Sequence, residues 1–245
     1  MPFALETFEP DRTAMFQRYA VYYTPAPESA LATFGAAWLG WDSATGQVVA
    51  HPDMGVDVAA VTETPRKYGF HGTMKPPFRL ASGQSVDALD AALAALCADA
   101  APVTLSGLKC AALGRFLALV PDGDTHALDA LAAQVVRDLD RFRAPLTEDD
   151  LARRRQRRLT AAQEAMLTRW GYPHVMEQFR FHMTLTGRLD ADVRVRVVRA
   201  LGPLLSELPL APYTLTGLAL LGEDAQGRFH QISRHRLGGA SPNRS

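Results

Sequence analysis

Two stretches of the sequence repeat one short word. Residues 67–74 read KYGFHGTM and residues 177–189 read EQFRFHMTLTGRL, and each contains a histidine, one further residue and a threonine. The two words are His71-Gly-Thr73 and His182-Met-Thr184. Side chains alternate across a β-strand, so residues two positions apart share a face. Both stretches are therefore predicted to be strands that carry a histidine and a threonine side by side.

The rows of side chains around the second word separate cleanly. Its apolar row consists of Phe179, Phe181, Met183 and Leu185, and its polar row consists of Arg180, His182, Thr184, Thr186 and Arg188. Around the first word, the row that contains His71 runs from Lys67 to Lys75. Each strand should thus bury its apolar face and expose its polar face, with basic residues at the ends of the strand.

The words belong to a longer repeat. TLSGL begins at Thr104 and TLTGL at Thr214, and GRF begins at Gly114 and again at Gly227. All three pairs recur in the same order at an offset of about 110 residues. The sequence therefore predicts an internal duplication of one unit: a histidine strand, a helix, a strand with TL[S/T]GL and a return strand.

Hydrophobic periodicity places the other elements. Expected strands cover 18–24, 102–113, 115–120, 213–222 and 228–237, and expected helices cover about 27–41, 85–98, 124–142, 147–170 and 190–206. Thr147 and Asp150 form a capping-box-like start, and Gly171 with Pro173 predicts the end of that helix. We expect an extension at 1–17, one bilobal domain over 18–237 and a frayed tail at 238–245. Its lobes should cover about 18–122 and 177–237, with inserted helices at about 124–172.

The composition excludes several classes of protein. The 245 residues include 26 Lys and Arg against 26 Asp and Glu, so no overall charge attracts nucleic acid or a membrane. The N-terminus lacks a signal peptide or long apolar run, which favours a cytoplasmic protein without membrane contact. Cys97 and Cys110 lack redox spacing and are interpreted as free thiols. No metal-binding, Walker or nucleophile-elbow motif is present, so we expect neither metal nor cofactor.

The polar strand faces suit phosphoryl chemistry. An imidazole titrates near neutral pH, so two facing histidines can act as base and acid in one displacement. Threonine hydroxyls can donate to phosphate oxygens, and Lys75, Arg180 and Arg188 can offset their charge, although basic strand ends also serve solubility. Tyr19 and Tyr23 share a strand face and either line the groove or belong to the core. The basic run RRRQRR at 153–158 follows three acids and is explained by a salt-bridged helix surface, with substrate contact as the alternative.

At its two H-x-T words the sequence resembles the 2H phosphoesterase superfamily. The words RYAVYYTP, FGAAWLGWD, RKYGFHGTMKPPFRL and FLALVP resemble its bacterial DUF1045 branch, which is associated with phosphonate-utilisation operons. The resemblance implies an α+β, bilobal, LigT-like fold of two antiparallel sheets with outer helices. It also implies metal-independent hydrolysis of a cyclic phosphodiester, or the reverse transfer, with His71 and His182 as the acid–base pair and Thr73 and Thr184 as phosphate donors.

Two other functions remain open at this point. A non-catalytic nucleotide- or RNA-binding module would use the same groove as a receptor, and an RNA end-processing or ligase-type enzyme would run the chemistry in reverse. The expected partner is a small phosphorylated molecule, either a cyclic nucleotide or a cyclic sugar phosphate, with an RNA fragment as the competitor. A monomer is favoured. The sequence does not assign the acid and the base between the two histidines.

Overall fold

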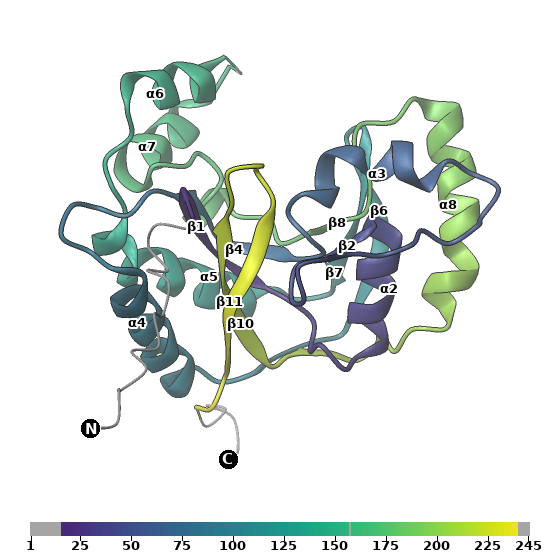
Figure 1. The fold of residues 1–245 in the computed structure, drawn as a ribbon, viewed down its shortest axis with the longest axis horizontal. Helices are drawn as coiled ribbons and strands as arrows, with labels where there is room; N and C mark the ends of the chain where they lie inside the picture. The colour runs from purple at the N-terminus through teal and green to yellow at the C-terminus, as the bar shows by residue number, and fades with distance from the viewer. Residues whose placement is uncertain (1–15, 157, 240–245) are drawn as a thin grey trace, which may run out of the picture.

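The structure, a computed structural model, describes residues 16–156 and 158–239, and its centre is one antiparallel sheet. Seven strands follow the order β11-β10-β1-β4-β8-β7-β6 (Figure 1). Their bounds are β1 Arg18–Tyr23, β4 Gly72–Phe78, β6 Gly107–Leu113, β7 Phe116–Asp122, β8 Met183–Thr184, β10 Gly217–Glu223 and β11 Phe229–Arg236. The α+β class expected from the sequence is confirmed.

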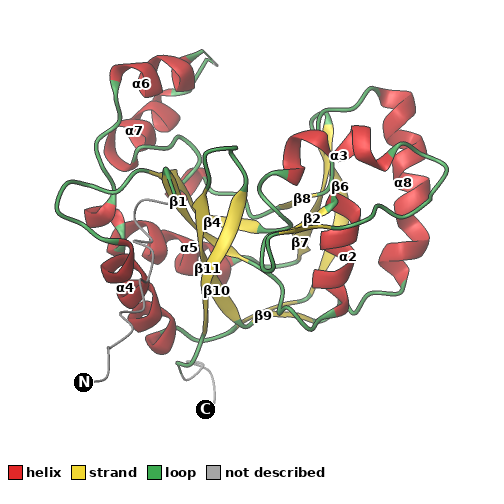
Figure 2. Cartoon of the chain, viewed as in Figure 1, coloured by secondary structure: helices red, strands yellow, loops and turns green. Residues whose placement is uncertain are grey.

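Helices and short ladders surround this sheet (Figure 2). The helices are α2 Ala30–Leu39, α3 Val58–Arg66, α4 Val86–Asp99, α5 His126–Asp138, α6 Glu148–Arg155, α7 Ala161–Trp170 and α8 Ala191–Ser206, with 3₁₀ turns at Asp140–Phe142 and Met176–Gln178. Strands β2 (Trp41–Asp42) and β3 (Gln47–Val48) form one ladder, and β5 (Val103–Leu105) and β9 (Tyr213–Leu215) form another. The helix α4 packs on β10 and β11, whereas α5 packs on β4.

The sheet consists of two halves that meet between the histidine strands. Only the pair Gly72 and Met183 joins β4 to β8. One half contains β11, β10, β1 and β4, and the other contains β8, β7 and β6. Figure 1 shows α4, α5, α6 and α7 beside the first half and α2, α3 and α8 beside the second. The bilobal arrangement therefore takes the form of one sheet with a narrow junction.

The order of elements supports the internal duplication, but the boundary between the two units lies at a different place from the one expected. The series strand, helix, histidine strand, helix, short strand and strand runs from β1 to β6 and again from β7 to β10. Each series places its last strand in the other half, because β6 pairs with β7 and β10 with β1. The strand expected to return within the first unit, β7, therefore opens the second. Accordingly, the halves are not the contiguous lobes expected at 18–122 and 177–237.

Equivalent residues of the two units face each other. Gly72 and Met183, which follow the two histidines, are paired between β4 and β8. Thr104 and Thr214, which begin the two TL[S/T]GL words, are paired between β5 and β9, with their hydroxyl oxygens 3.0 Å apart. These pairings are what a pseudo-two-fold axis between two duplicated units would produce, because residues beside such an axis contact their own equivalents.

Several element boundaries differ from the sequence-based expectations. The helix expected over 147–170 is broken into α6 and α7, because residues 158–160 are not helical and Thr160 caps a new helix. The capping box of Thr147 and Asp150 is confirmed, as is the end of α7 at Gly171, which adopts a left-handed φ of 74°. The helix α3 lies in a segment for which neither a helix nor a strand was expected. Most of the strand expected over 177–189 is irregular, with β8 limited to two residues.

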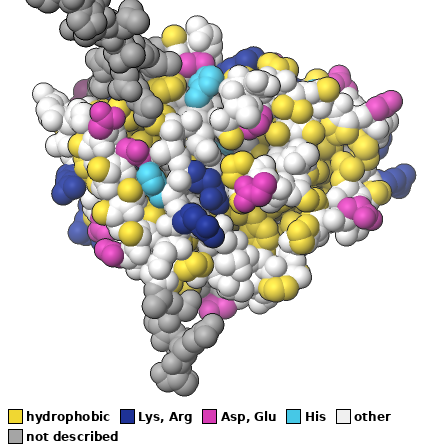
Figure 3. All heavy atoms as spheres, turned by 60° about the horizontal axis from the view of Figure 1, so that its bottom comes forward, with side chains coloured by type: hydrophobic (Ala, Val, Ile, Leu, Met, Phe, Trp, Pro, Cys, Tyr) yellow, Lys and Arg dark blue, Asp and Glu magenta, His cyan; other side chains and the backbone are white. Residues whose placement is uncertain are grey.

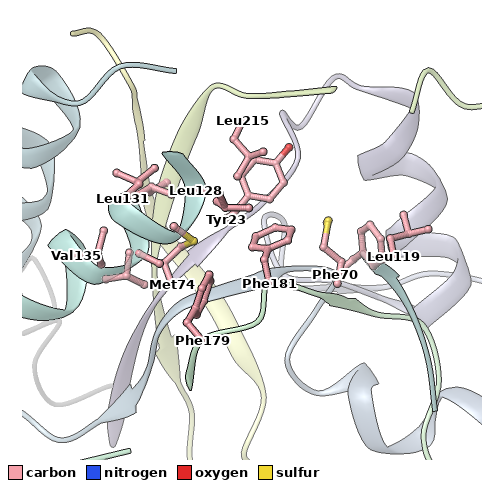
Figure 4. Packing of buried hydrophobic residues seen from close by; sticks show 14 of the residues in the cluster. Tyr23, Phe70, Met74, Leu119, Leu128, Leu131, Val135, Phe179, Phe181 and Leu215 are labelled. Atoms are coloured by element: carbon pink, nitrogen blue, oxygen red, sulfur yellow. The ribbon is translucent and has the colours of Figure 1, made fainter. Parts of the chain in front are cut away.

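The main core lies on the face of the sheet that is covered by helices. Figure 4 shows Phe181 and Tyr23 directed toward each other, with Met74 directed toward α5. The apolar row predicted around His182 is buried as expected: Phe179, Phe181, Met183 and Leu185. We call this side the helix face and the opposite side, which carries His71, the histidine face. A smaller buried cluster of Ala20, Tyr22, Ala219, Leu221 and Phe229 covers part of the histidine face.

The surface carries charges of both signs. Acidic and basic side chains are interspersed on the face shown in Figure 3 rather than gathered into patches of one sign. Cys97 and Cys110 are free thiols, as expected, with Cys97 buried. In the part of the chain that the structure describes, no helix combines the length and apolar character needed to cross a membrane. The proposed extension and tail fall mostly on residues 1–15 and 240–245, outside the described part.

Candidate functional site

The two H-x-T words lie next to each other at the junction of the two halves. Antiparallel pairing of Gly72 with Met183 sets His71 opposite Thr184 and Thr73 opposite His182. Directly opposite residues share a face, with their Cβ atoms about 4.5–5.5 Å apart. The four side chains therefore form a compact square on the histidine face, with the two imidazoles on one diagonal.

The ring of His71 is held by its own strand. Its Nδ1 lies 2.9 Å from the carbonyl oxygen of Gly69, and its Nε2 lies 3.1 Å from the hydroxyl of Thr73. A carbonyl oxygen only accepts, so Nδ1 carries the proton, and in the neutral ring Nε2 accepts from the threonine. Burial, with a smaller contribution from the charge of His182, lowers the pKa of His71 to about 4, although the contact with the Gly69 carbonyl acts in the opposite direction. His71 is therefore a neutral base at physiological pH.

The ring of His182 is held in the same way but is more open. Its Nδ1 lies 2.8 Å from the carbonyl oxygen of Arg180, two residues earlier, just as His71 uses Gly69. Phe116 is the aromatic neighbour, with ring centroids 5.8 Å apart. Donation from Nδ1 leaves Nε2 of His182 directed away from the backbone and available to a ligand.

One substitution between the repeats explains the difference between the two histidines. Tyr22 pairs with Thr73 on β4, and Ala118 pairs with Thr184 on β8, so Tyr22 and Ala118 occupy equivalent places. The Tyr22 ring stacks on His71, with centroids 3.7 Å apart and planes 18° apart. Alanine offers no such cover to His182. The buried phenol of Tyr22 thus creates the low-dielectric side of the site.

Two hollows flank the square. His182 and Thr73 line a cavity of about 310 Å³, together with Tyr172, His174 and Arg180. His71 and Thr184 line another of about 420 Å³, with Tyr68, Phe116 and Arg188 among its walls. Arg180 and Arg188 thus lie where the sequence expected them, one beside each hollow, and their role in binding phosphate stays a prediction. Ligand sites of small molecules are commonly concave and of this size.

Lys75 does not share the histidine face, contrary to the sequence-based expectation. Tyr22 pairs with Thr73 but Val21 pairs with Lys75, so Met74 is an extra residue that forms a β-bulge. The bulge turns Lys75 to the helix face, where it is buried and its Nζ lies 3.1 Å from the carbonyl oxygen of Val136. Its ion pair with Asp140 spans 3.2 Å. Lys75 is therefore a core residue and not a phosphate ligand.

The groove-lining role considered for Tyr19 and Tyr23 is also wrong. Both side chains are 2% exposed and belong to the main core on the helix face. The hydroxyl of Tyr23 bonds to that of Tyr213 (Figure 4 shows Tyr23 beside Phe181). Tyr22, between them, is the tyrosine at the site. Alternation along β1 separates the two rows, but only the pairing of β1 with β4 tells which row faces His71.

The described residues contain no group of three or more His, Cys, Asp or Glu side chains arranged to hold a metal ion. In the square at the junction, the groups that can exchange protons near neutral pH are the two imidazoles, and the hydroxyls come from the two threonines. What the square can do chemically is to accept a proton at one corner and donate a proton at the other, while two hydroxyls and two guanidinium groups contact an anion between them.

Comparison with known proteins places the chain in a family. A family described as "Protein of unknown function (DUF1045)" matches residues 73–230, which is more than half of the chain. The chain belongs to the DUF1045 family. The resemblance to the DUF1045 family inferred from the sequence is thereby confirmed. This DUF1045 match begins within the first H-x-T word, at Thr73, and includes the whole of the second.

Curated relatives of this DUF1045 protein bear the name of a kinase. "Ribose 1,5-bisphosphate phosphokinase PhnN" of Janthinobacterium sp. (strain Marseille) is 40% identical over 190 residues, which are 75% of this chain and 42% of that protein. The protein of the same name from Laribacter hongkongensis (strain HLHK9) is 35% identical over 221 residues, 89% of this chain and 51% of that protein. The chain thus spans about half the length of the curated relatives that it matches.

Solved structures with similar chain paths share little sequence with the DUF1045 protein. E. coli LigT complexed with 3'-AMP is 15% identical, with a TM-score of 0.43, over 91% of this chain and 98% of that one. A structure described as "phosphoesterase" is 15% identical with a TM-score of 0.41 over the same shares. TT0787 of Thermus thermophilus is 13% identical, with a TM-score of 0.38, over 91% of this chain and 100% of that one.

Proposed function

We propose that the protein is a phosphoesterase that hydrolyses a cyclic phosphodiester of a small sugar phosphate or nucleotide by two-histidine acid–base catalysis. The observation that carries this proposal is the square of His71, Thr73, His182 and Thr184. Both imidazoles donate through Nδ1 to a backbone carbonyl two residues earlier, which directs both Nε2 atoms to the same face of the sheet. A receptor for phosphate has no need of two proton carriers held in this way.

The asymmetry of the site supports one distribution of the two roles. His71 is neutral and takes a proton from water through Nε2 as the water oxygen forms a bond to phosphorus. His182 gives its proton to the ester oxygen that leaves, so one P–O bond forms, one P–O bond breaks and the product is a phosphomonoester. A bound anionic phosphate raises the pKa of His71 from its low value toward neutrality, which makes the ring a stronger base once substrate is present.

The remaining groups stabilise charge. The hydroxyl of Thr73 lies 3.1 Å from Nε2 of His71 and turns to a phosphate oxygen when substrate enters. Thr184, opposite His71, serves the other side of the phosphoryl group. Arg180 and Arg188 stand beside the two hollows and offset the negative charge that develops on the phosphoryl oxygens. Positioned donors of this kind supply most of the catalysis in phosphoryl transfer.

The names of the curated relatives suggest the class of substrate. The name of these relatives refers to ribose 1,5-bisphosphate, and about half of their length matches this chain. Opening a 1,2-cyclic phosphate of ribose that also bears a 5-phosphate, with the oxygen on C2 as the leaving group, yields ribose 1,5-bisphosphate, which is the compound in that name. We therefore favour a phosphorylated ribose cyclic phosphate over an RNA end. The role in phosphonate metabolism implied by the family resemblance is part of this proposal.

The test measures turnover of a small panel of candidate substrates in the presence of EDTA. The panel contains ribose cyclic phosphates that carry or lack a 5-phosphate, and 2',3'-cyclic nucleotides. We expect His71→Ala and His182→Ala each to lose about 100-fold to 10,000-fold of the rate. His126→Ala is a suitable control, because His126 lies at the start of α5, outside the site. Tight binding without turnover, unaffected by either substitution, would instead establish the receptor function.

A further inference from the structure

A group of basic side chains stands beside the site at the end of the groove near α6. Arg18, Lys75, Arg79, Arg143 and Arg154 line one small cavity of about 20 Å³. This cavity shares Pro76 and Val175 with the larger hollow into which His182 opens. The basic group therefore lies directly behind the wall of the proposed catalytic groove.

The carboxylates near this group are too few for its cations. Asp140 pairs with both Lys75 and Arg143. Asp150 pairs with both Arg79 and Arg153. Glu223 pairs with Arg18. Three carboxylates thus serve four cations of the group and Arg153 besides, whereas Arg154, the fifth member, has no ion pair with any residue that the structure describes.

Arg154 also has an unsatisfied donor. Its Nε is buried and has no hydrogen-bond acceptor among the described residues. Its guanidinium lies over the ring of Tyr172, 5.0 Å from the centroid, and Tyr172 lines the hollow beside His182. A buried donor without an acceptor is costly, and one common reason for it is an ion that binds there. The missing acceptor and the surplus positive charge both call for an anion.

The histidine face connects this point to the catalytic square. Arg18 and Tyr22 lie four residues apart on the regularly paired strand β1, so their side chains point to the same side. Tyr22 stacks on His71. A substrate whose cyclic phosphate rests on the square beside His182 can extend past Tyr172, which lines that hollow, toward Arg154.

We propose that Arg154, supported by Arg18, forms a second anion subsite that takes a phosphomonoester group of the same substrate. The inference rests on the proposed function and narrows it to substrates with two phosphate groups. It also gives a role to part of the basic run 153–158. Arg153 and Arg155 are engaged with Asp150 and Glu164, as expected for a salt-bridged helix surface, whereas Arg154 faces inward.

The test compares two ligands that cannot be turned over, ribose 1-phosphate and ribose 1,5-bisphosphate, by calorimetry. In the wild type, the 5-phosphate should tighten binding by at least about tenfold, as expected for charge-assisted hydrogen bonds. In Arg154→Gln this gain should fall to less than about twofold, while ribose 1-phosphate binds as before. Arg153→Gln is the matched control on the same helix and should keep the gain. An equal gain in wild type and Arg154→Gln, or no gain in the wild type, overturns the subsite.

A second readout separates binding from folding. Because Arg154 has no carboxylate partner among the described residues, Arg154→Gln should leave the melting temperature unchanged or slightly higher. A clear fall would assign Arg154 to the packing of α6 on Tyr172 and overturn the proposal. These measurements require no catalysis. If no cyclic ester is hydrolysed but the gain from the 5-phosphate depends on Arg154, the phosphoesterase proposal fails and the subsite stands.

Discussion

The imidazole of His71 lies stacked on the phenol ring of Tyr22, with ring centroids 3.7 Å apart and an angle of 18° between the planes. The residue equivalent to Tyr22 beside the second histidine is Ala118. The two histidines bond to the backbone in the same way. One face of the His71 ring is covered by Tyr22, however, whereas the His182 ring has only an alanine at the equivalent place. A duplicated fold places two like groups together, and a change at one neighbouring position makes them chemically unlike.

Replacing Tyr22 with alanine should raise the pKa of His71 from about 4 toward its ordinary value of 6.5, because burial is the main cause of the shift. The ring would then be protonated in mild acid and lost as a base. We expect the ratio of kcat/KM at pH 5 to kcat/KM at pH 8 to be at least about tenfold lower in Tyr22→Ala than in the wild type. Tyr22→Phe retains the stacking and should behave as the wild type. NMR titration of His71 measures the pKa directly, and an unchanged value in Tyr22→Ala would refute the explanation.

The same shift predicts how stability depends on pH. Between pH 6.5 and about 4 the unfolded chain binds a proton at His71 that the folded chain does not bind. Stability should therefore fall as the pH is lowered through this window. Chemical denaturation of wild type and His71→Asn at several pH values measures the contribution, which should be smaller in the variant. A wild-type slope that persists unchanged in His71→Asn would assign the effect to other groups.

The alternation and the repeat could be predicted because both can be recognised along the sequence without knowledge of which strands pair. The sequence predicted the apolar row from Phe179 to Leu185 and the two H-x-T words on one face. It could not reveal the bulge at Met74, since an extra residue in a strand is defined only against its partner. Because of this bulge, the side chain of Lys75 does not lie on the histidine face, where the sequence predicted it. For the same reason, the exchange of β6 and β10 between the halves was not visible along the chain.

Lys75→Met tests the assignment of Lys75 to the core. Burial of a charged ammonium is costly, and Asp140 keeps its ion pair with Arg143 after the substitution, so Lys75→Met should be about as stable as the wild type at pH 7. The Michaelis constant should not change. Burial lowers the pKa of Lys75 to about 8. The wild type should thus gain stability relative to the variant between pH 8 and 10.5, as the folded chain loses this proton before the unfolded chain does. A raised Michaelis constant would restore Lys75 to the site.

Asp150 should contribute to stability through α6. Its carboxylate accepts from Arg79, Arg153 and Thr147, and these contacts hold its pKa at about 2, although burial acts against them. We expect Asp150→Asn to lose about 1–3 kcal/mol at pH 7, a loss typical of hydrogen bonds to charged groups. The exposed neighbour Asp149 provides the control Asp149→Asn. The greater stability of the wild type over Asp150→Asn should be complete above pH 3.8 and should vanish as the pH falls toward 2. Equal stability of Asp150→Asn and Asp149→Asn at pH 7 would contradict this role of Asp150.

Two glycine-to-alanine substitutions should have opposite effects on stability. A Cβ on Gly72, at the junction of the two halves, would lie 2.3 Å from the ring of Phe181, which is itself packed in the core. Gly72→Ala should therefore destabilise the protein by about 1–3 kcal/mol through overpacking. Gly202 lies within α8 with open space around its Cα, so Gly202→Ala should stabilise it by about 0.5–1 kcal/mol through helix propensity. Because Gly72 also spaces the two H-x-T words, its substitution should lower kcat at temperatures where the variant is still folded. Unchanged stability and rate in Gly72→Ala would show that β4 and β8 are not held together as described.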